Sequence, residues 1–258
     1  MLEAKNIGYA VGKKWLVKDI SYRFMPGKCY MICGPNGAGK STFLKLLSLE
    51  LSPASGSICY NNELSINSQK EKYAKCRAVL SQNTEISFPM DVEEIVMMGR
   101  YPHFNISPAK KDHDICEEVM ENLGVTDFRK RNYLTLSGGE KQRVQFARVL
   151  TQIFDIPEKG YRYLLLDEPI SSLDLKYQFD FLHHVRNFIN EKTIVIAILH
   201  DLNLALNYSD EVLLLNEGGL FAAGPPADVL HPSNIKKVFH IESSLHKVGD
   251  AQFLWVRK

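Results

Sequence analysis

Residues 34–42 read GPNGAGKST and lie between the apolar run CYMIC and a helical pattern that extends from Thr42 to Leu51. These residues match the pattern G-x-x-x-x-G-K-[ST], and the order of strand, glycine-rich turn and helix is the context that this pattern requires. Its glycines let the backbone wrap closely around phosphates, and the following helix N-terminus presents free N–H donors. Lys40 can reach β- and γ-phosphates, while the Ser41 hydroxyl can ligate Mg²⁺. The predicted phosphate-binding residues are Gly34, Pro35, Asn36, Gly37, Ala38, Gly39, Lys40, Ser41 and Thr42.

An α/β pattern surrounds this loop. Short β-rich runs precede it at residues 2–11 and 19–24, and two continuous apolar runs, YRYLLL and TIVIAIL, follow much later. Continuous apolar runs are typical of strands that are buried on both faces of a parallel sheet. The 258 residues are enough to bury the core of one large α/β domain.

Residues 88–150 have a different character, because apolar residues recur at every fourth position from Ile115 to Leu123. This period predicts a helical insertion between two parts of one α/β domain. We therefore expect a single domain over 1–258, with a nucleotide-binding core of residues 1–87 and 151–258 and a helical subdomain of residues 88–150.

Charge and cysteine content exclude several classes of protein. The net charge is +1, from 31 basic and 30 acidic residues, which gives no electrostatic reason to expect a nucleic-acid partner. The five cysteines are scattered without a CxxC pair, so neither a disulfide framework nor a zinc site is indicated, and a reducing cytoplasm fits best. The longest apolar runs are shorter than the roughly 20 residues that cross a bilayer, and no signal segment is evident, so we expect any membrane association to be peripheral.

Acidic and imidazole side chains follow the two late strands. Asp167 and Glu168 follow the apolar part of YLLLDEP, at the carboxyl edge of a parallel sheet where such folds place their ligands. One carboxylate can hold the Mg²⁺ shell, and the next can orient and deprotonate water. Alone, such an acidic pair is usually a solvated turn. His200 after TIVIAIL and Gln82 in VLSQN are each unremarkable in isolation as well. The order of these residues along the chain strengthens the catalytic interpretation.

The stretch LTLSGGEKQR begins a helix in an unusual way. Ser137 and Glu140 form an N-terminal capping box, yet the two positions between them are Gly138 and Gly139. Each glycine weakens a helix by about 1 kcal/mol relative to alanine. A capping box does not need glycine there, so the pair requires another reason.

Together these motifs resemble the nucleotide-binding subunits of ABC transporters over nearly the whole chain. The motifs that carry the resemblance stand in the order of that family: GPNGAGKST, Gln82, LSGGEKQR, LLLDEP, SSLD ending at Asp174, and LHD with His200. LSGGE is the diagnostic member, because other P-loop proteins have the phosphate loop and the acidic residues after a strand without it. The resemblance implies a P-loop NTPase fold: a RecA-like core with an N-terminal antiparallel β subdomain and an inserted α-helical subdomain.

The resemblance also implies a role for each residue, with ATP and Mg²⁺ as cofactors. Glu168 is implied as the general base, His200 as a γ-phosphate contact, and Gln82 as a sensor of Mg²⁺ and γ-phosphate. Ser41, Gln82 and Asp167 are implied as Mg²⁺ ligands. Two copies pack head to tail in this family, so Ser137, Gly138 and Gly139 would contact the nucleotide of the second copy, and Asp174 would communicate across the dimer.

A narrower resemblance, to the ATP-binding subunits of haem importers, rests on residues 88–103, 152–169 and 198–206. Related subunits for ferric siderophores and vitamin B12 share much of it, so these remain alternatives. The implied partners are a second copy, transmembrane permease subunits and, indirectly, a periplasmic or surface binding protein. The implied location is the cytoplasmic face of the inner membrane. An ABC ATPase of DNA repair or translation is the alternative from another class.

Two positions depart from the family pattern. One is Ile170 in DEPISSLD, where threonine is common and no named catalytic role rests. Where an aromatic residue often stacks on adenine, this chain has Val11, and Tyr9 on the same strand face is a substitute. His103, His183 and His184 lack metal-ligand spacing, so we expect no metal site at these histidines.

Overall fold

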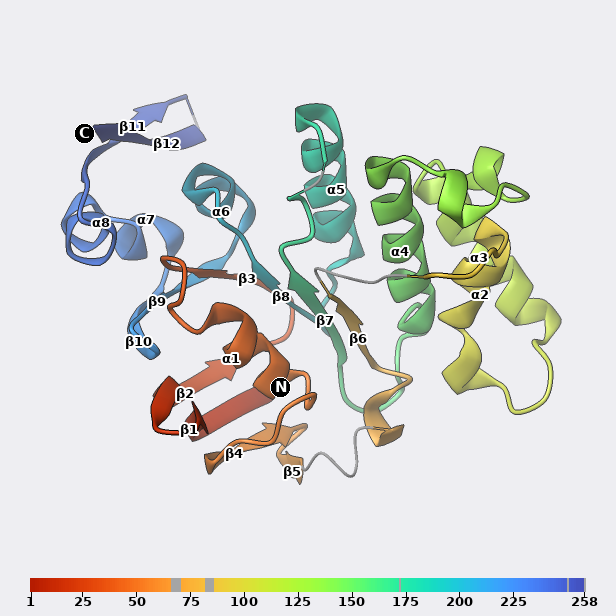
Figure 1. Ribbon diagram of the computed structural model, residues 1–258, viewed down its shortest axis with the longest axis horizontal. Helices are drawn as coiled ribbons and strands as arrows, with labels where there is room; N and C mark the ends of the chain where they lie inside the picture. Colours follow the sequence, from red (N-terminus) through yellow and green to blue (C-terminus); the bar gives the residue numbers. More distant parts are fainter. Residues whose placement is uncertain (66–70, 82–85, 172, 250, 258) are drawn as a thin grey trace.

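The computed structural model describes residues 1–65, 71–81, 86–171, 173–249 and 251–257 (Figure 1). Among these residues, the main sheet has six strands in the order β10-β9-β3-β8-β7-β6, and all are parallel except β10 at the edge. The strands are β3 (Lys28–Cys33), β6 (Arg77–Leu80), β7 (Arg162–Asp167), β8 (Thr193–Ile198), β9 (Glu211–Asn216) and β10 (Gly219–Gly224). Strands β7 and β8 are buried throughout, as their continuous apolar runs predict.

A second, antiparallel sheet has the order β2-β1-β4-β5 in the described part of the chain. Its strands are β1 (Leu2–Val11), β2 (Lys14–Phe24), β4 (Ser55–Tyr60) and β5 (Glu63–Ser65). Helix α1 (Lys40–Leu47) shares one apolar cluster with both sheets, through residues such as Phe43, Ile20 and Ile196. The helix ends earlier than the predicted Leu51, because Leu49 takes a left-handed conformation with φ of 61°.

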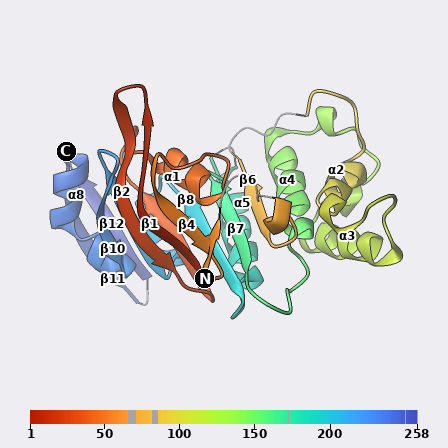
Figure 2. The same cartoon turned by 90° about the horizontal axis from the view of Figure 1, so that it is seen from below.

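Helices gather beyond β6, at the end of the molecule away from the antiparallel sheet (Figures 1 and 2). Helix α4 packs against α2, α3 and β6, and it continues past the expected boundary at residue 150. The helices and short 3-10 turns of this unit are α2 (Val92–Met98), η2 (Tyr101–His103), α3 (Lys110–Asn122), η3 (Thr126–Phe128), η4 (Tyr133–Thr135) and α4 (Gly138–Gln152).

A buried guanidinium ties this helical unit together. Arg100 donates to Asp112 at 2.9 Å, to Asp155 at 2.8 Å and to the Thr151 carbonyl at 2.8 Å. Arg100 is only 2% exposed, so its charge is stable there only because these oxygens replace water. The contacts fix η2 against α3 and the end of α4.

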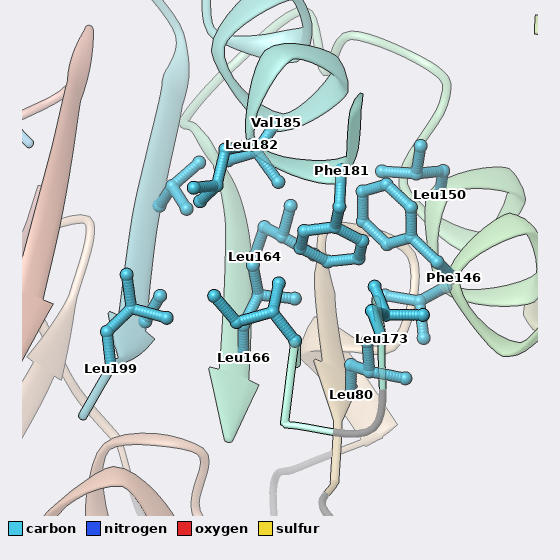
Figure 3. Packing of buried hydrophobic residues seen from close by; sticks show 14 of the residues in the cluster. Leu80, Phe146, Leu150, Leu164, Leu166, Leu173, Phe181, Leu182, Val185 and Leu199 are labelled. Carbon is cyan, nitrogen blue, oxygen red and sulfur yellow. The ribbon is translucent and has the colours of Figure 1, made fainter. Parts of the chain in front are cut away.

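The largest apolar cluster fills the space between the main sheet, α4 and α5 (Leu175–Phe188). Phe146 of α4 and Phe181 of α5 meet with ring centroids 4.2 Å apart, beside Leu164 and Leu166 of β7 (Figure 3). Of the remaining elements, α6 (Leu202–Tyr208) lies between β8 and β9 along the chain. The others follow β10: α7 (Pro226–Val229), α8 (Pro232–Phe239), β11 (Glu242–Val248) and β12 (Ala251–Arg257). Within the described ranges, no helix has both the length and the apolar character that a membrane span requires.

The close approach of α2 to α4 gives a stability prediction. A Cβ on Gly99 would lie 2.1 Å from the Arg148 carbonyl oxygen and 2.2 Å from Thr151 Oγ1. Gly99→Ala should therefore separate the two helices and lower the free energy of unfolding by roughly 1–3 kcal/mol. Gly219→Ala is the matched control, because its nearest neighbour would be 3.7 Å away. Urea unfolding measures both, and equal midpoints for Gly99→Ala and the wild type would contradict this packing.

Candidate functional site

The phosphate loop connects β3 to α1, and glycine is required by its shape. Gly34 and Gly39 have φ of 148° and 93°. A Cβ on Gly39 would lie 2.2 Å from the Leu16 carbonyl oxygen, and one on Gly34 would lie 2.3 Å from that of Leu215. Any other residue would thus both strain the backbone and collide with a neighbouring strand. The loop leaves the first N–H groups of α1 available for an anion.

Lys40 and Ser41 begin α1 at the centre of this loop. The Lys40 ammonium donates to the carbonyls of Gly34 at 2.8 Å and Pro35 at 3.0 Å, and burial lowers its pKa. Two neutral carbonyls hold the cation in the loop, where an anion would relieve its desolvation. The Ser41 hydroxyl donates to Asp167 Oδ1 at 3.2 Å, which joins the phosphate loop to the end of β7.

Two carboxylates lie at the carboxyl end of β7. Asp167 is nearly buried, and burial raises its pKa although the Ser41 hydrogen bond opposes the shift. Glu168 has φ of 50°, a left-handed conformation that is uncommon outside glycine and is concentrated at functional sites. Its Oε1 lies 2.6 Å from His200 Nε2, which follows the neighbouring strand β8. The sheet therefore brings a carboxylate and an imidazole into direct contact beside the phosphate loop.

The second glycine pair opens α4, and the capping box that the sequence predicts is present. Ser137 Oγ accepts from the Glu140 N–H at 3.3 Å, and Glu140 Oε2 accepts from the Ser137 N–H at 2.7 Å. A Cβ on Gly138 would meet no described atom within 4 Å, and one on Gly139 would meet only Leu173 Cδ2 at 3.6 Å. Packing within one chain therefore does not explain either glycine.

The sheet order separates this helix from the phosphate loop. The loop follows β3, whereas α4 packs beside β6, and β8 and β7 lie between them (Figure 1). Three strand spacings amount to about 14 Å, which is too far for one γ-phosphate to contact both. Instead, α4 contacts the segment after Glu168, since Gln142 Nε2 donates to the Pro169 carbonyl at 2.8 Å. Sequence reasoning missed Gln142, although it lies inside LSGGEKQR.

The remaining predicted residues are Asp174, Val11, Tyr9 and Gln82. Asp174 caps α5, where its Oδ1 accepts from the Tyr177 N–H at 3.2 Å. Val11 is exposed, whereas Tyr9 is half-buried against the apolar cluster of the antiparallel sheet. Gln82 lies outside the described residues, so its predicted contact with Mg²⁺ and γ-phosphate has no geometry here.

Two of the histidines set aside on sequence grounds make contacts within the protein. His103 Nε2 lies 2.8 Å from the Gln152 carbonyl oxygen, and burial lowers its pKa. His183 packs edge-on against Tyr208. In the part of the chain that the structure describes, no group of three or more His, Cys, Asp or Glu residues could hold a metal ion.

A glycine loop before a buried lysine, with acidic residues at the carboxyl end of β7 in the same parallel sheet, defines a P-loop nucleoside-triphosphatase. Residues 17–171 match the family described as ABC transporter, and the chain belongs to that family. The predicted fold class is thereby confirmed. The protein binds ATP and couples its hydrolysis to transport, as this family does.

Several known proteins are similar over almost their full length. The hemin import ATP-binding protein HmuV of Gloeobacter violaceus is 43% identical, over 94% of this chain and 88% of its own. The protein of the same name from Bordetella avium is 42% identical, over 95% of this chain and 94% of its own. An inward-facing ABC transporter assigned to the metal-chelate type has a TM-score of 0.81 at 25% identity, covering 99% of this chain and 96% of that one. A dimeric ABC transporter cassette, with a TM-score of 0.75 at 20% identity over 88% of this chain and 99% of that one, supports the fold alone.

The raised pKa of Asp167 gives a stability prediction for the nucleotide-free protein. Because the folded state holds this proton more tightly than the unfolded state, stability falls as pH rises from the ordinary Asp pKa through the raised value. Asp167→Asn keeps an acceptor for Ser41 without the buried charge. It should raise Tm by a few degrees at neutral pH, and the gain should shrink towards pH 4. Exposed Asp127→Asn is the control; an unchanged or lowered Tm for Asp167→Asn at pH 7 would contradict the argument.

Proposed function

We propose that this protein is the ATP-hydrolysing subunit of a haem importer, and that it works as a head-to-tail pair of identical chains on a membrane permease. The observation that supports haem as the transported molecule is the similarity to two hemin import ATP-binding proteins, at 42–43% identity over more than nine tenths of the chain. The location that goes with this role is the cytoplasmic face of the inner membrane, where the subunit would bind its permease peripherally. A periplasmic or surface binding protein would deliver the haem.

The phosphate loop would hold the ATP phosphates. Residues 34–42 would donate backbone N–H groups, and Lys40 would exchange its two loop carbonyls for β- and γ-phosphate oxygens. This exchange is favourable because a buried ammonium gains two anionic partners in place of neutral ones.

The side chains of Ser41 and Asp167 are suited to a magnesium ion. Ser41 Oγ and Asp167 Oδ1 are 3.2 Å apart, which supplies the oxygen donors that Mg²⁺ prefers. Burial raises the pKa of the Asp167 carboxyl, and a bound cation would reverse that shift. When bound, Mg²⁺ would neutralise charge that develops on the phosphates. Ser41, Asp167 and Gln82 are the proposed ligands.

Glu168 and His200 would act on the attacking water. Their contact of 2.6 Å supports this role, because it would provide a proton acceptor and an imidazole donor close to the γ-phosphate. Glu168 would accept the proton of water, while His200 would turn its N–H to a γ-phosphate oxygen. The left-handed backbone of Glu168 holds this side chain in place at some conformational cost, as is common in active sites.

The second copy would complete each site. Gly138 and Gly139 leave the N-terminus of α4 open, and Ser137 adds a hydroxyl, so this surface suits the γ-phosphate of a partner's ATP. Asp174 and the segment tied to Gln142 would join the two sites across the interface. Closure on two ATP molecules and reopening after hydrolysis would drive the permease by a shift in population.

A ferric-siderophore importer is the second candidate, because the solved structure with a TM-score of 0.81 belongs to a transporter of the metal-chelate type. A vitamin B12 importer has no comparable observation in its favour here. The ATPase mechanism is the same for all three cargoes.

Glu168→Gln should trap an ATP-bound dimer. The substitution removes the proposed base while Lys40, Ser41 and Asp167 still hold the nucleotide, so hydrolysis should fall by at least about 100-fold. Sizing chromatography with Mg-ATP measures the dimer. Glu217→Gln is the matched control, because Glu217 also has a left-handed backbone, with φ of 48°. Hydrolysis by Glu168→Gln within a few-fold of the wild-type rate would reject Glu168 as the base.

Growth on defined iron sources tests the cargo. A deletion strain should lose growth on haem as sole iron source and keep growth on inorganic iron. The wild-type gene should restore growth, whereas Glu168→Gln should not, because transport needs hydrolysis. Unchanged growth on haem with lost growth on a ferric siderophore would move the protein to the second candidate and leave its ATPase chemistry in place.

A further inference from the structure

The C-terminal hairpin stands apart from both main sheets. Strands β11 and β12 pair only with each other in the described part of the chain, and they lie beyond residues 17–171 that match the family. An isolated two-stranded hairpin is marginally stable in water, so it needs an anchor. Figure 1 shows β12 beside α6, at the opposite end of the molecule from α2 and α3.

Two asparagines on α6 provide this anchor. Asn203 accepts from the Leu254 N–H at 2.6 Å and donates to the Leu254 carbonyl at 3.3 Å. Asn207 accepts from the Gln252 N–H at 3.2 Å and donates to the Gln252 carbonyl at 2.7 Å. Residues four apart share a helix face, and residues two apart share a strand edge, so the two amides pair with the free edge of β12 as another strand would.

Apolar packing reinforces the same contact. Leu254 is 4% exposed and belongs to the large core cluster, together with Leu204 and Leu206 of α6. A helix that supplies both amide pairs and apolar contacts is held in position along its whole length. The hairpin therefore fixes where α6 begins.

The start of α6 in turn fixes His200. The segment from β8 to α6 contains only residues 199–201, and Asp201 caps the helix by accepting from the N–H groups of Asn203 at 2.8 Å and Leu204 at 3.0 Å. On the other side, the Leu199 N–H donates to the Ile32 carbonyl at 3.4 Å. With so short a connection, a displacement of the first turn of α6 must displace the imidazole that contacts Glu168.

We propose that the C-terminal hairpin positions His200 for hydrolysis, and that Asn203 and Asn207 are the positioning residues through which it acts. The proposal rests on the role of His200 in the proposed function. An imidazole that must meet both Glu168 and a γ-phosphate oxygen tolerates little displacement, and misplacement of about 1 Å can cost up to 100-fold in rate. The hairpin would affect the chemical step and leave ATP binding alone, since the phosphate loop belongs to a different part of the core.

A mutant cycle in the full-length protein tests this positioning role. Asn203→Ala with Asn207→Ala should lower kcat by about tenfold and leave KM for ATP unchanged. In a His200→Ala background, the same pair should change kcat by less than about twofold, because the group to be positioned is gone. Single-turnover hydrolysis of radiolabelled ATP resolves the slow variants. Asn234→Ala is the matched control, since its amide also donates to two backbone carbonyls but joins α8 to the end of α7.

An equal fall in kcat in both backgrounds, a rise in KM that accounts for the loss, or an unchanged kcat would overturn the positioning role. A different result would reject the proposed role of His200 itself. If His200→Ala kept the wild-type kcat, both that role and the positioning role of the hairpin would be wrong. If the paired variant does not fold, Asn207→Ala alone should lower kcat by about threefold with KM unchanged, and wild-type turnover by that variant would count against the proposal.

Discussion

The strand order β3-β8-β7-β6 is the constraint on which the rest of the structure depends. It places the phosphate loop after β3 and the open N-terminus of α4 beside β6, with two strands between them. The same order sets the ends of β7 and β8 next to each other, so that Glu168 meets His200. One chain therefore holds the proposed catalytic carboxylate beside its own phosphate loop, while the α4 N-terminus proposed to bind a second anion is exposed.

Burial around the loop stores unfavourable electrostatic energy in the nucleotide-free protein. Burial lowers the pKa of Lys40 and raises that of Asp167, so each group is held away from its preferred charged state. ATP phosphates and Mg²⁺ would provide the opposite charges. Nucleotide binding would thus relieve desolvation within the core, and this relief would contribute free energy to the proposed closure.

Sequence predicts features that depend on neighbouring residues, and it fails where distant segments meet. The strand at residues 2–11 and the capping box at Ser137 were predicted because period and spacing are local. The predicted end of α1 was wrong because the left-handed turn at Leu49 has no glycine to signal it. The contacts of Asn203 and Asn207 with β12 were not predictable, because asparagines on a short helix usually face water. Roles assigned by resemblance, including that of Gln82, remain proposals.

The most direct measurement of the central claim uses mixed dimers in the Glu168→Gln background. One tagged chain carries Ser137→Arg and the other carries Lys40→Ala, so a mixed dimer has one intact phosphate loop facing an intact α4 N-terminus. The account predicts that neither chain dimerises alone with Mg-ATP, that the mixture forms a dimer carrying both tags, and that this dimer retains a single bound nucleotide. Failure of the mixture to dimerise, or loss of ATP binding by Ser137→Arg monomers as complete as that by Lys40→Ala, would contradict a site shared between two chains.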